Sequence, residues 1–213
     1  MPVAADAALL RCWYARLPGA DPAELTVVAV LSEDFPAESV VDLPGGRRPP
    51  GWQLAVRLTG ATVRSVEVAL PDAPLLWYVE LPEPDADPVA TTWLAFSDSR
   101  FAEGSLLTAE AARAAGVAGD HQVAALRWWP DTGLVHQLYV APQHRRRGVA
   151  GKLVQAAFGV QAARGLPHLH GDGRRTDLGE QFRRGLPRYA AWRLSEWTQR
   201  LPSMDPEPGQ AAS

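Results

Sequence analysis

The chain has 213 residues, of which 46% are hydrophobic, and its formal net charge is −3. This length and composition exclude a largely disordered chain and predict one elaborated domain or two small ones. The slightly acidic charge gives no general reason to expect nucleic acid as a partner, so any basic chemistry must be local.

Cysteine content and hydropathy bear on the compartment. Cys12 is the single cysteine, which excludes an intrachain disulfide and favours a cytoplasmic setting. No apolar run approaches the roughly 20 residues that span a bilayer, so a membrane is not expected as a partner. Residues 1–10 lack the early positive charge and the apolar core of a signal peptide.

The first part of the chain combines a helical pattern with strand patterns. A helix is predicted to end at Pro18-Gly19, and its apolar face holds Leu9, Leu10, Trp13 and Leu17. Val-rich or alternating runs predict strands at residues 25–31, 53–59, 62–70 and 75–81. The last three runs are separated by short turn signals, which indicates an antiparallel meander.

An acidic, proline-rich stretch at residues 82–88 is the best candidate for a boundary. A strand is predicted at residues 89–96, and Thr108 can cap a short alanine-rich helix. Residues 123–129 and 134–140 then form a predicted hairpin around the turn sequence Pro-Asp-Thr-Gly.

The last part of the chain alternates helices with one short strand. A helix with one apolar face follows residue 148 and ends near Gly165. A strand is predicted at residues 166–172 and a further helix at residues 175–185. A C-terminal helix is then predicted from the spacing of Tyr189, Trp192, Trp197 and Leu201.

The junction between the hairpin and the long helix has the composition of a phosphate-binding turn. Gly148, Ala150 and Gly151 let a ligand approach the backbone closely, since bulky side chains would block it. The N–H groups of a first helical turn have no intrahelical partners and attract anions. Positive charge is added by Arg145, Arg146 and Arg147.

This segment resembles the acetyl-CoA pyrophosphate loop of the GNAT N-acetyltransferase superfamily, whose pattern is Gln/Arg-x-x-Gly-x-Gly/Ala. Arg145, Gly148 and Ala150 match that pattern, and Val140-Ala141-Pro142 precedes it as in the family. The order of hairpin, loop, helix, strand and helix extends the resemblance over about residues 123–186.

The resemblance implies an α/β fold, with a mixed, largely antiparallel GNAT-like sheet flanked by helices. The N-terminal half is an elaboration, and a helical C-terminus replaces the last two strands that are usual in the family. We expect residues 1–85 to form an N-terminal helix and antiparallel strands, packed on or continuous with the core. Residues 86–200 form the acetyl-CoA-binding core, and residues 201–213 a flexible tail.

The resemblance also implies a cofactor site. Acetyl-CoA or another short acyl-CoA is the expected co-substrate, with no metal ion. The backbone of Leu138, Tyr139 and Val140 takes the pantetheine arm by position. The loop and the start of the helix take the pyrophosphate, through Arg145, Arg146, Arg147, Gly148, Val149, Ala150 and Gly151.

The loop pattern does not identify the catalytic groups, for which several candidates remain. A histidine with an ordinary pKa near ~6.5 suits removal of a proton from an amine, and His136 and His170 are the candidates. His168, His170 and Asp172 alternate and are expected to share one face. The family's usual acid is a Tyr in the last core helix, where this chain has Phe182. Tyr139, Tyr189 or a water molecule is then left to protonate the leaving thiolate.

The resulting hypothesis is an N-acetyltransferase acting on a primary amine of a small molecule or a peptide, and a homodimer is compatible with it. The main alternative is a catalytically silent acyl-CoA-binding or interaction module on the same scaffold. A metal hydrolase, from the sequence His168-x-His170-x-Asp172, is a weaker alternative. A nucleic-acid binder lacks any supporting signature.

Overall fold

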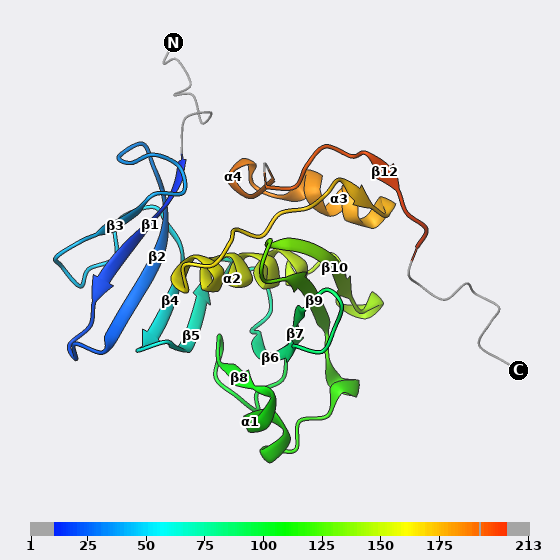
Figure 1. The fold of residues 1–213 in the computed structure, drawn as a ribbon, viewed down its shortest axis with the longest axis horizontal. Coiled ribbons are helices and arrows are strands. Elements are labelled where there is room, and N and C mark those ends of the chain that lie inside the picture. The colour runs from blue at the N-terminus through cyan, green and yellow to red at the C-terminus, as the bar shows by residue number, and fades with distance from the viewer. Residues whose placement is uncertain (1–10, 192, 204–213) are drawn as a thin grey trace, which may run out of the picture.

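The computed structural model describes residues 11–191 and 193–203. The first five strands form a sheet, here called sheet A, in the order β3-β1-β2-β4-β5 (Figure 1). They are β1 (Arg11–Pro18), β2 (Glu24–Ser32), β3 (Val40–Asp42), β4 (Trp52–Thr59) and β5 (Thr62–Val68). Neighbours pair antiparallel except β1 and β3, which are parallel.

The next five strands form sheet B, in the order β10-β9-β7-β6-β8. They are β6 (Trp77–Glu83), β7 (Ala90–Phe96), β8 (Leu106–Thr108), β9 (Ala124–Trp129) and β10 (Leu134–Val140). Only β6 and β8 pair in parallel. The predicted mixed, largely antiparallel α/β fold is therefore confirmed.

The two sheets are joined through the backbone at β5. The Val66 N–H donates to the Gly104 carbonyl at 2.8 Å, and the Gly104 N–H donates to the Leu76 carbonyl at 2.7 Å. Ser65 also forms an isolated antiparallel bridge with Ser105, just before β8. The N-terminal half is thus attached to sheet B by main-chain hydrogen bonds.

Few helices complete the described part of the chain. They are α1 (Ala109–Ala114), α2 (Val149–Ala163), α3 (Asp177–Gly185) and α4 (Arg188–Ala191), with 3₁₀ turns at Gly119–His121 and Pro142–His144. The short strands β11 (Arg174–Arg175) and β12 (Gln199–Arg200) pair in parallel. In Figure 1, α3, α4 and β12 lie together on the side of α2 and β10 away from α1.

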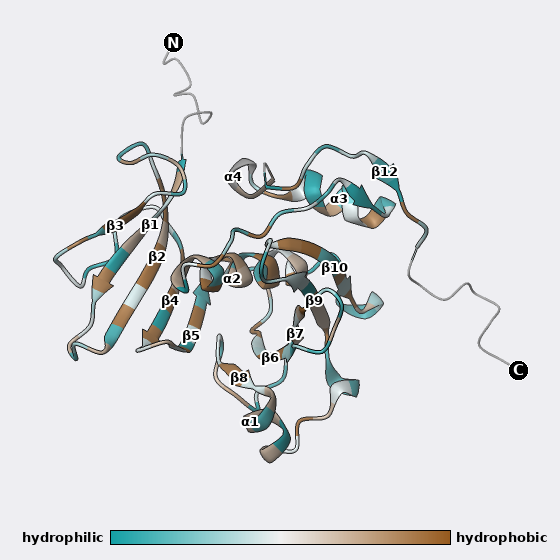
Figure 2. Cartoon of the chain, viewed as in Figure 1, coloured by the Kyte–Doolittle hydropathy of each residue, from teal (hydrophilic) through white to brown (hydrophobic). Residues whose placement is uncertain are grey.

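Helix α2 lies between the two sheets (Figure 1) and contacts β2, β4 and β5 on one side and β9 and β10 on the other. Its residues are buried without a break from Lys152 to Ala162. A helix covered on all sides needs apolar or small residues on every face instead of one stripe. Figure 2 shows the contrast with α3, which is largely hydrophilic. The core of the molecule is therefore organised around α2.

The predicted N-terminal helix is wrong, because residues 11–18 form strand β1. Trp13 and Leu17 pack on one face of sheet A, whereas Cys12 and Tyr14 pack on the other, against the core around α2. A strand buried on both faces has a nearly continuous apolar run, which imitates helical spacing. Leu9 and Leu10, also assigned to that helix, lie outside the described residues.

The predicted C-terminal helix is confined to α4, which ends at Ala191. Beyond it, Trp197 and Leu201 lie outside any helix, and Gln199–Arg200 forms β12. Trp192 and residues 204–213 of the predicted tail lie outside the described residues. The spacing of the aromatic residues is typical of a helix, but residues 193–201 run beside residues 171–175 and bond to their backbone.

The domain boundary predicted at residue 85 also needs correction. It falls inside the hairpin of β6 and β7, which pair along their whole length in sheet B. The predicted three-stranded meander is also broken, since β4 and β5 pair in sheet A but β6 belongs to sheet B. The change of sheet lies between Val68 and Trp77.

Candidate functional site

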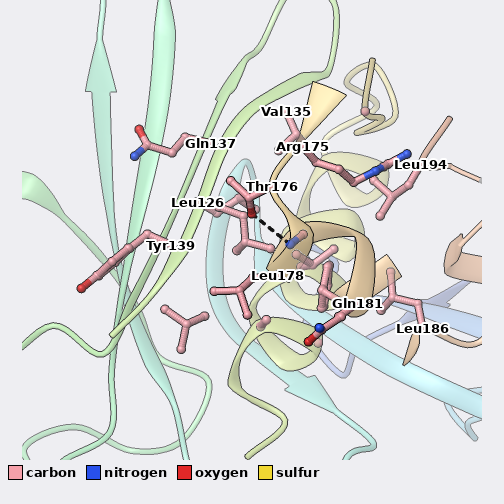
Figure 3. A pocket seen from close by; sticks show the side chains of 18 of the residues that line it. Leu126, Val135, Gln137, Tyr139, Arg175, Thr176, Leu178, Gln181, Leu186 and Leu194 are labelled. Carbon is pink, nitrogen blue, oxygen red and sulfur yellow. Dashed lines mark hydrogen bonds between the residues drawn. The ribbon is translucent and has the colours of Figure 1, made fainter. Parts of the chain in front are cut away.

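A cavity of about 810 Å³ lies between β10, the start of α2 and helix α3 (Figure 3). Its other wall is formed by residues 171–176 and by a C-terminal stretch that includes Leu194 and residues 201–203. Much of the lining is apolar, and basic side chains stand at the loop before α2. A cavity of this size and character suits an organic ligand that carries an anionic group.

The cavity opens because two neighbouring segments diverge. The Val135 N–H donates to the His170 carbonyl at 2.8 Å, and the His170 N–H donates to the Gly133 carbonyl at 2.9 Å. This parallel contact is an isolated bridge and not the continuous strand predicted for residues 166–172. Beyond Val135 the cavity occupies the space beside β10. The outer edge of β10 is therefore open to a ligand.

The turn before α2 has backbone N–H groups without backbone partners and lies beside the cavity. Within the described chain, the N–H groups of residues 146–151 donate to no backbone carbonyl. Arg146 and Gly148 have left-handed φ values of 61° and 79°, and Gly148 is the N-cap of α2. His144, Arg145 and Arg146 line the cavity, but Arg147 does not. Unbonded N–H groups beside positive charge form a favourable site for an anion.

Side chains around the turn fix its geometry. Arg145 Nε donates to the Val140 carbonyl at 3.0 Å, so this residue braces the turn against the end of β10. The Lys152 ammonium is buried, and it donates to the Pro74 carbonyl at 3.0 Å and to the Glu103 carboxylate. Lys152 therefore anchors the start of α2 to the loops that precede β6 and β8.

Gly148 is required by packing as well as by its φ angle. A Cβ atom at Gly148 would lie 2.8 Å from the Ala73 Cβ, whereas a Cβ at Gly151 would meet only the Leu70 Cδ1 at 3.8 Å. Both glycines line the cavity. Gly151 is therefore the better position at which to test ligand binding without disturbing the fold.

Strand β10 contributes three polar residues to the lining of the cavity. His136 lines the cavity and stacks on Trp129, with ring centroids 5.6 Å apart. Gln137 and Tyr139 also line it, and both extend away from α3 in Figure 3. Leu138 and Val140 pack toward the core around α2. A register shift between Val135 and Gln137 marks the point where β10 becomes irregular.

The predicted histidine strand does not converge on the cavity. His168 Nδ1 lies 2.9 Å from a carboxylate oxygen of Glu38 in the N-terminal half. His170 is exposed, its Nδ1 lies 3.3 Å from the His168 carbonyl, and it does not line the cavity. Asp172 lines the cavity and accepts a hydrogen bond from the Arg174 N–H at 2.8 Å. Of these three residues, only Asp172 therefore lines the cavity.

Helix α3 supplies a wall that the sequence had indicated only in part. The Thr176 hydroxyl accepts a hydrogen bond from the Gly179 N–H at 3.1 Å, shown dashed in Figure 3, and caps the helix. Leu178, Gln181 and Phe182 line the cavity. Helical spacing places these residues on one face, which was the available signal. Phe182 has no proton to donate at this position.

Two other wall residues, Leu194 and Pro202, were not predicted, and no local motif marks them.

Among other reactive groups, Cys12 and Tyr14 do not line the cavity. Burial raises the pKa of the Cys12 thiol to about 12 and also raises the pKa of Tyr14. Both groups therefore stay protonated at neutral pH and are unsuited to act as nucleophiles.

Within residues 11–191 and 193–203, no three His, Cys, Asp or Glu side chains gather in a way that could hold a metal ion. The metal-hydrolase alternative therefore has no ligand set in this part of the chain. No helix in the same ranges is both long and apolar enough to cross a membrane.

Comparison with known proteins gives one match. The model of the acetyltransferase (GNAT) family matches residues 70–171, which contain sheet B, the loop and α2. No curated protein and no solved structure matches the chain. The match ends at Gly171, next to the isolated bridge of His170 with Leu134. Residues 70–171 are therefore assigned to the GNAT acetyltransferase family.

Proposed function

We propose that the protein transfers an acetyl or other short acyl group from acyl-CoA to a primary amine of a small molecule or a peptide. The observation that carries this proposal is the turn at residues 146–151, whose N–H groups donate to no backbone carbonyl and which borders a cavity beside an open strand edge. The assignment of residues 70–171 to the GNAT family supports the same reaction class. The single, buried cysteine favours a cytoplasmic setting.

The loop before α2 and strand β10 bind different parts of the acyl-CoA co-substrate. The amides of Arg146, Arg147, Gly148, Val149, Ala150 and Gly151 hold the pyrophosphate. The pantetheine arm lies along β10, where the backbone of Leu138, Tyr139 and Val140 borders the cavity. Arg145 supports this binding indirectly. Its side chain donates a hydrogen bond to the Val140 carbonyl and so stabilises the turn.

His136 is the proposed general base. The amine nitrogen attacks the thioester carbon, the C–N bond forms, and the C–S bond breaks as the thiolate leaves. His136 takes the proton from the amine, directly or through one water, and Tyr139 protonates the thiolate. Both residues line the cavity on β10, which supports these roles. His170 is not retained as a base, because its side chain is outside the lining.

Phe182 favours one alternative function, a catalytically silent acyl-CoA-binding module. It occupies the α3 wall where a proton donor would be expected by resemblance, and it cannot donate a proton. In that case the protein binds CoA but releases no thiol with any amine.

A binding experiment with two variants at one position tests the cofactor site. In Gly151→Asp a carboxylate enters the first turn of α2, where it stabilises the helix but repels a phosphate. Acetyl-CoA affinity, measured by calorimetry, should fall by at least about 100-fold, or about 2.7 kcal/mol. Gly151→Ala, the matched control, should bind within about twofold of wild type.

Unchanged affinity in a folded Gly151→Asp protein would refute the pyrophosphate assignment. Release of CoA thiol is then followed with wild-type protein and a mixed library of amines. Thiol release supports the transferase, and CoA binding without release across the library supports the silent module. A wild-type protein that does not bind acetyl-CoA contradicts both functions.

A further inference from the structure

A buried arginine connects the C-terminal stretch to the N-terminal half of the chain. The Arg193 side chain is only 3% exposed. Its Nη2 lies 2.6 and 2.5 Å from the two carboxylate oxygens of Glu38 and 2.9 Å from the Tyr14 hydroxyl oxygen. The same guanidinium lies over the Phe158 ring of α2, 4.5 Å from the ring centroid.

Glu38 is held firmly in place to receive this arginine. It has a left-handed φ of 64°, which is uncommon for a residue with a side chain. Its N–H donates to the Cys12 carbonyl of β1 at 2.7 Å. A second partner, His168 Nδ1, lies 2.9 Å from its carboxylate. A buried charge of this kind is strongly destabilising when its partner is removed.

Arg193 is equally tied to the wall of the cavity. The Gly171 N–H donates to the Arg193 carbonyl at 3.2 Å, and the Ser195 hydroxyl donates to the Gly171 carbonyl at 2.6 Å. Gly171, Leu194 and Phe158 all line the cavity. The guanidinium therefore packs on Phe158, a lining residue, while Arg193 itself does not line the cavity.

The wall continues beyond Arg193 as a paired stretch of backbone. The Thr198 N–H donates to the Gly173 carbonyl at 3.0 Å, and the Leu201 N–H donates to the Arg175 carbonyl at 2.9 Å. Residues 193–201 thus run in parallel beside residues 171–175. Within the described chain, Arg193 is where this pair of segments is linked by an ion pair to the N-terminal half at Glu38.

We propose that Arg193 is a positioning residue, which fixes residues 171–175 and 193–201 against α2 and so sets the width of the acyl-CoA cavity. This inference rests on the proposed function for its ligand. It also gives the N-terminal half, which lies outside the matched family domain, a part in binding. Glu38 and Tyr14 hold the Arg193 side chain in place. The Arg193 carbonyl accepts a hydrogen bond from Gly171 and so fixes the position of the cavity wall.

The test separates this role from general stability. Glu38→Gln and Arg193→Lys each weaken the link and keep a similar side-chain size. Glu38→Gln should raise the Kd of acetyl-CoA about tenfold, equal to about 1.4 kcal/mol. The maximal rate at saturating acyl-CoA should stay within about twofold, because no reacting group is altered. Arg193→Lys should show a smaller rise, since it keeps the charge but loses the planar fork.

Val30→Ala is the matched control for lost stability. Val30 is buried in a separate cluster of sheet A with Trp13 and does not line the cavity. The Val30→Ala substitution should lower the melting temperature. It should leave the Kd of acetyl-CoA unchanged at a temperature where all variants are folded. The double variant, Glu38→Gln with Arg193→Gln, leaves no unpaired buried charge from this pair. It remains informative if a single variant does not fold.

Hydrogen exchange without ligand provides an independent readout. Glu38→Gln should speed exchange at the Gly171, Thr198 and Leu201 amides more than in sheet A. Unchanged exchange there, or an unchanged Kd in the folded Glu38→Gln and double variants, would overturn the proposal. If wild-type protein fails to bind acetyl-CoA, the proposed function is contradicted, and exchange alone decides whether Arg193 fixes the wall.

Discussion

At the scale of single residues, the two candidate histidines have different surroundings. His136 stacks on Trp129 at the edge of the cavity, whereas the His170 ring lies outside it. Only the backbone of His170 meets β10, through its bonds to Gly133 and Val135. Sequence alternation cannot distinguish these cases, because it predicts the face of a strand only when the segment forms a regular strand.

Substitution of the two histidines should therefore have unequal effects. His136→Gln should lower the maximal rate on the order of 100-fold, because the group that takes the amine proton is lost. His170→Gln should leave the rate unchanged, and acetyl-CoA affinity should be unchanged in both. Steady-state kinetics and calorimetry check this, and equal loss in the two variants would contradict the assignment of His136.

At the scale of elements, α2 is held at its end by a carboxylate of sheet B. Glu80 of β6 receives hydrogen bonds from Arg164 at 2.6 and 2.9 Å and from Trp93 Nε1 at 3.1 Å. Burial alone would raise the pKa of Glu80, but the bonds and attraction to Arg164 outweigh it and hold the pKa below its ordinary value of 4.5. Its stabilising contribution is complete above that value and is lost as pH falls through the lower pKa of the folded protein.

Glu80→Gln should lower the free energy of unfolding by about 2 kcal/mol at neutral pH. The difference from wild type should shrink as pH falls below about 4.5, where the unfolded chain begins to protonate Glu80 while the folded protein still keeps it ionised. Urea unfolding at several pH values measures both. Glu67→Gln is the matched control, since the Glu67–Arg48 pair is more exposed and should contribute at most about 1 kcal/mol. A pH-independent difference for Glu80→Gln would contradict this account.

Local elements of the core were predictable, because their signals lie within short windows. The β9–β10 hairpin, the Thr108 and Thr176 caps and the helix after Gly148 follow from turn, cap and periodic patterns. The second wall was not predictable. The pairing of residue 171 with Leu194, like that of Glu38 with His168, joins distant segments, and no local pattern encodes it. The prediction of a helix at the position of β1 was wrong for a related reason, since the burial of this strand on both faces depends on later parts of the chain.

At the scale of the whole molecule, sheet A completes the core of the matched domain. The α2 backbone approaches β4 closely at Gly159, where a Cβ would lie 2.4 Å from the Leu54 Cδ1. Without sheet A, this side of α2 would face water and Arg193 would lose both Glu38 and Tyr14. The domain recognised at residues 70–171 is therefore not expected to be a folding unit by itself.

A chain limited to residues 70–203 should consequently fail to fold cooperatively. We expect a broad urea transition, loss of near-UV circular dichroism and no measurable binding of acetyl-CoA. The full-length chain, purified in the same way, serves as the control. A sharp transition with retained binding in the fragment would indicate that sheet A is dispensable.

The distance along the chain between Tyr14 and Arg193 has a consequence for the order of folding. The two residues in this hydrogen bond are 179 positions apart. A ribosome releases the chain from its N-terminus, so both sheets and α2 emerge before the stretch that closes the cavity. Such long-range closure is slow compared with the formation of local hairpins. In a refolding experiment, we therefore expect acyl-CoA binding to appear later than the circular dichroism signal of the β-sheets. A nascent chain would accordingly bind acyl-CoA only after its last segment has docked.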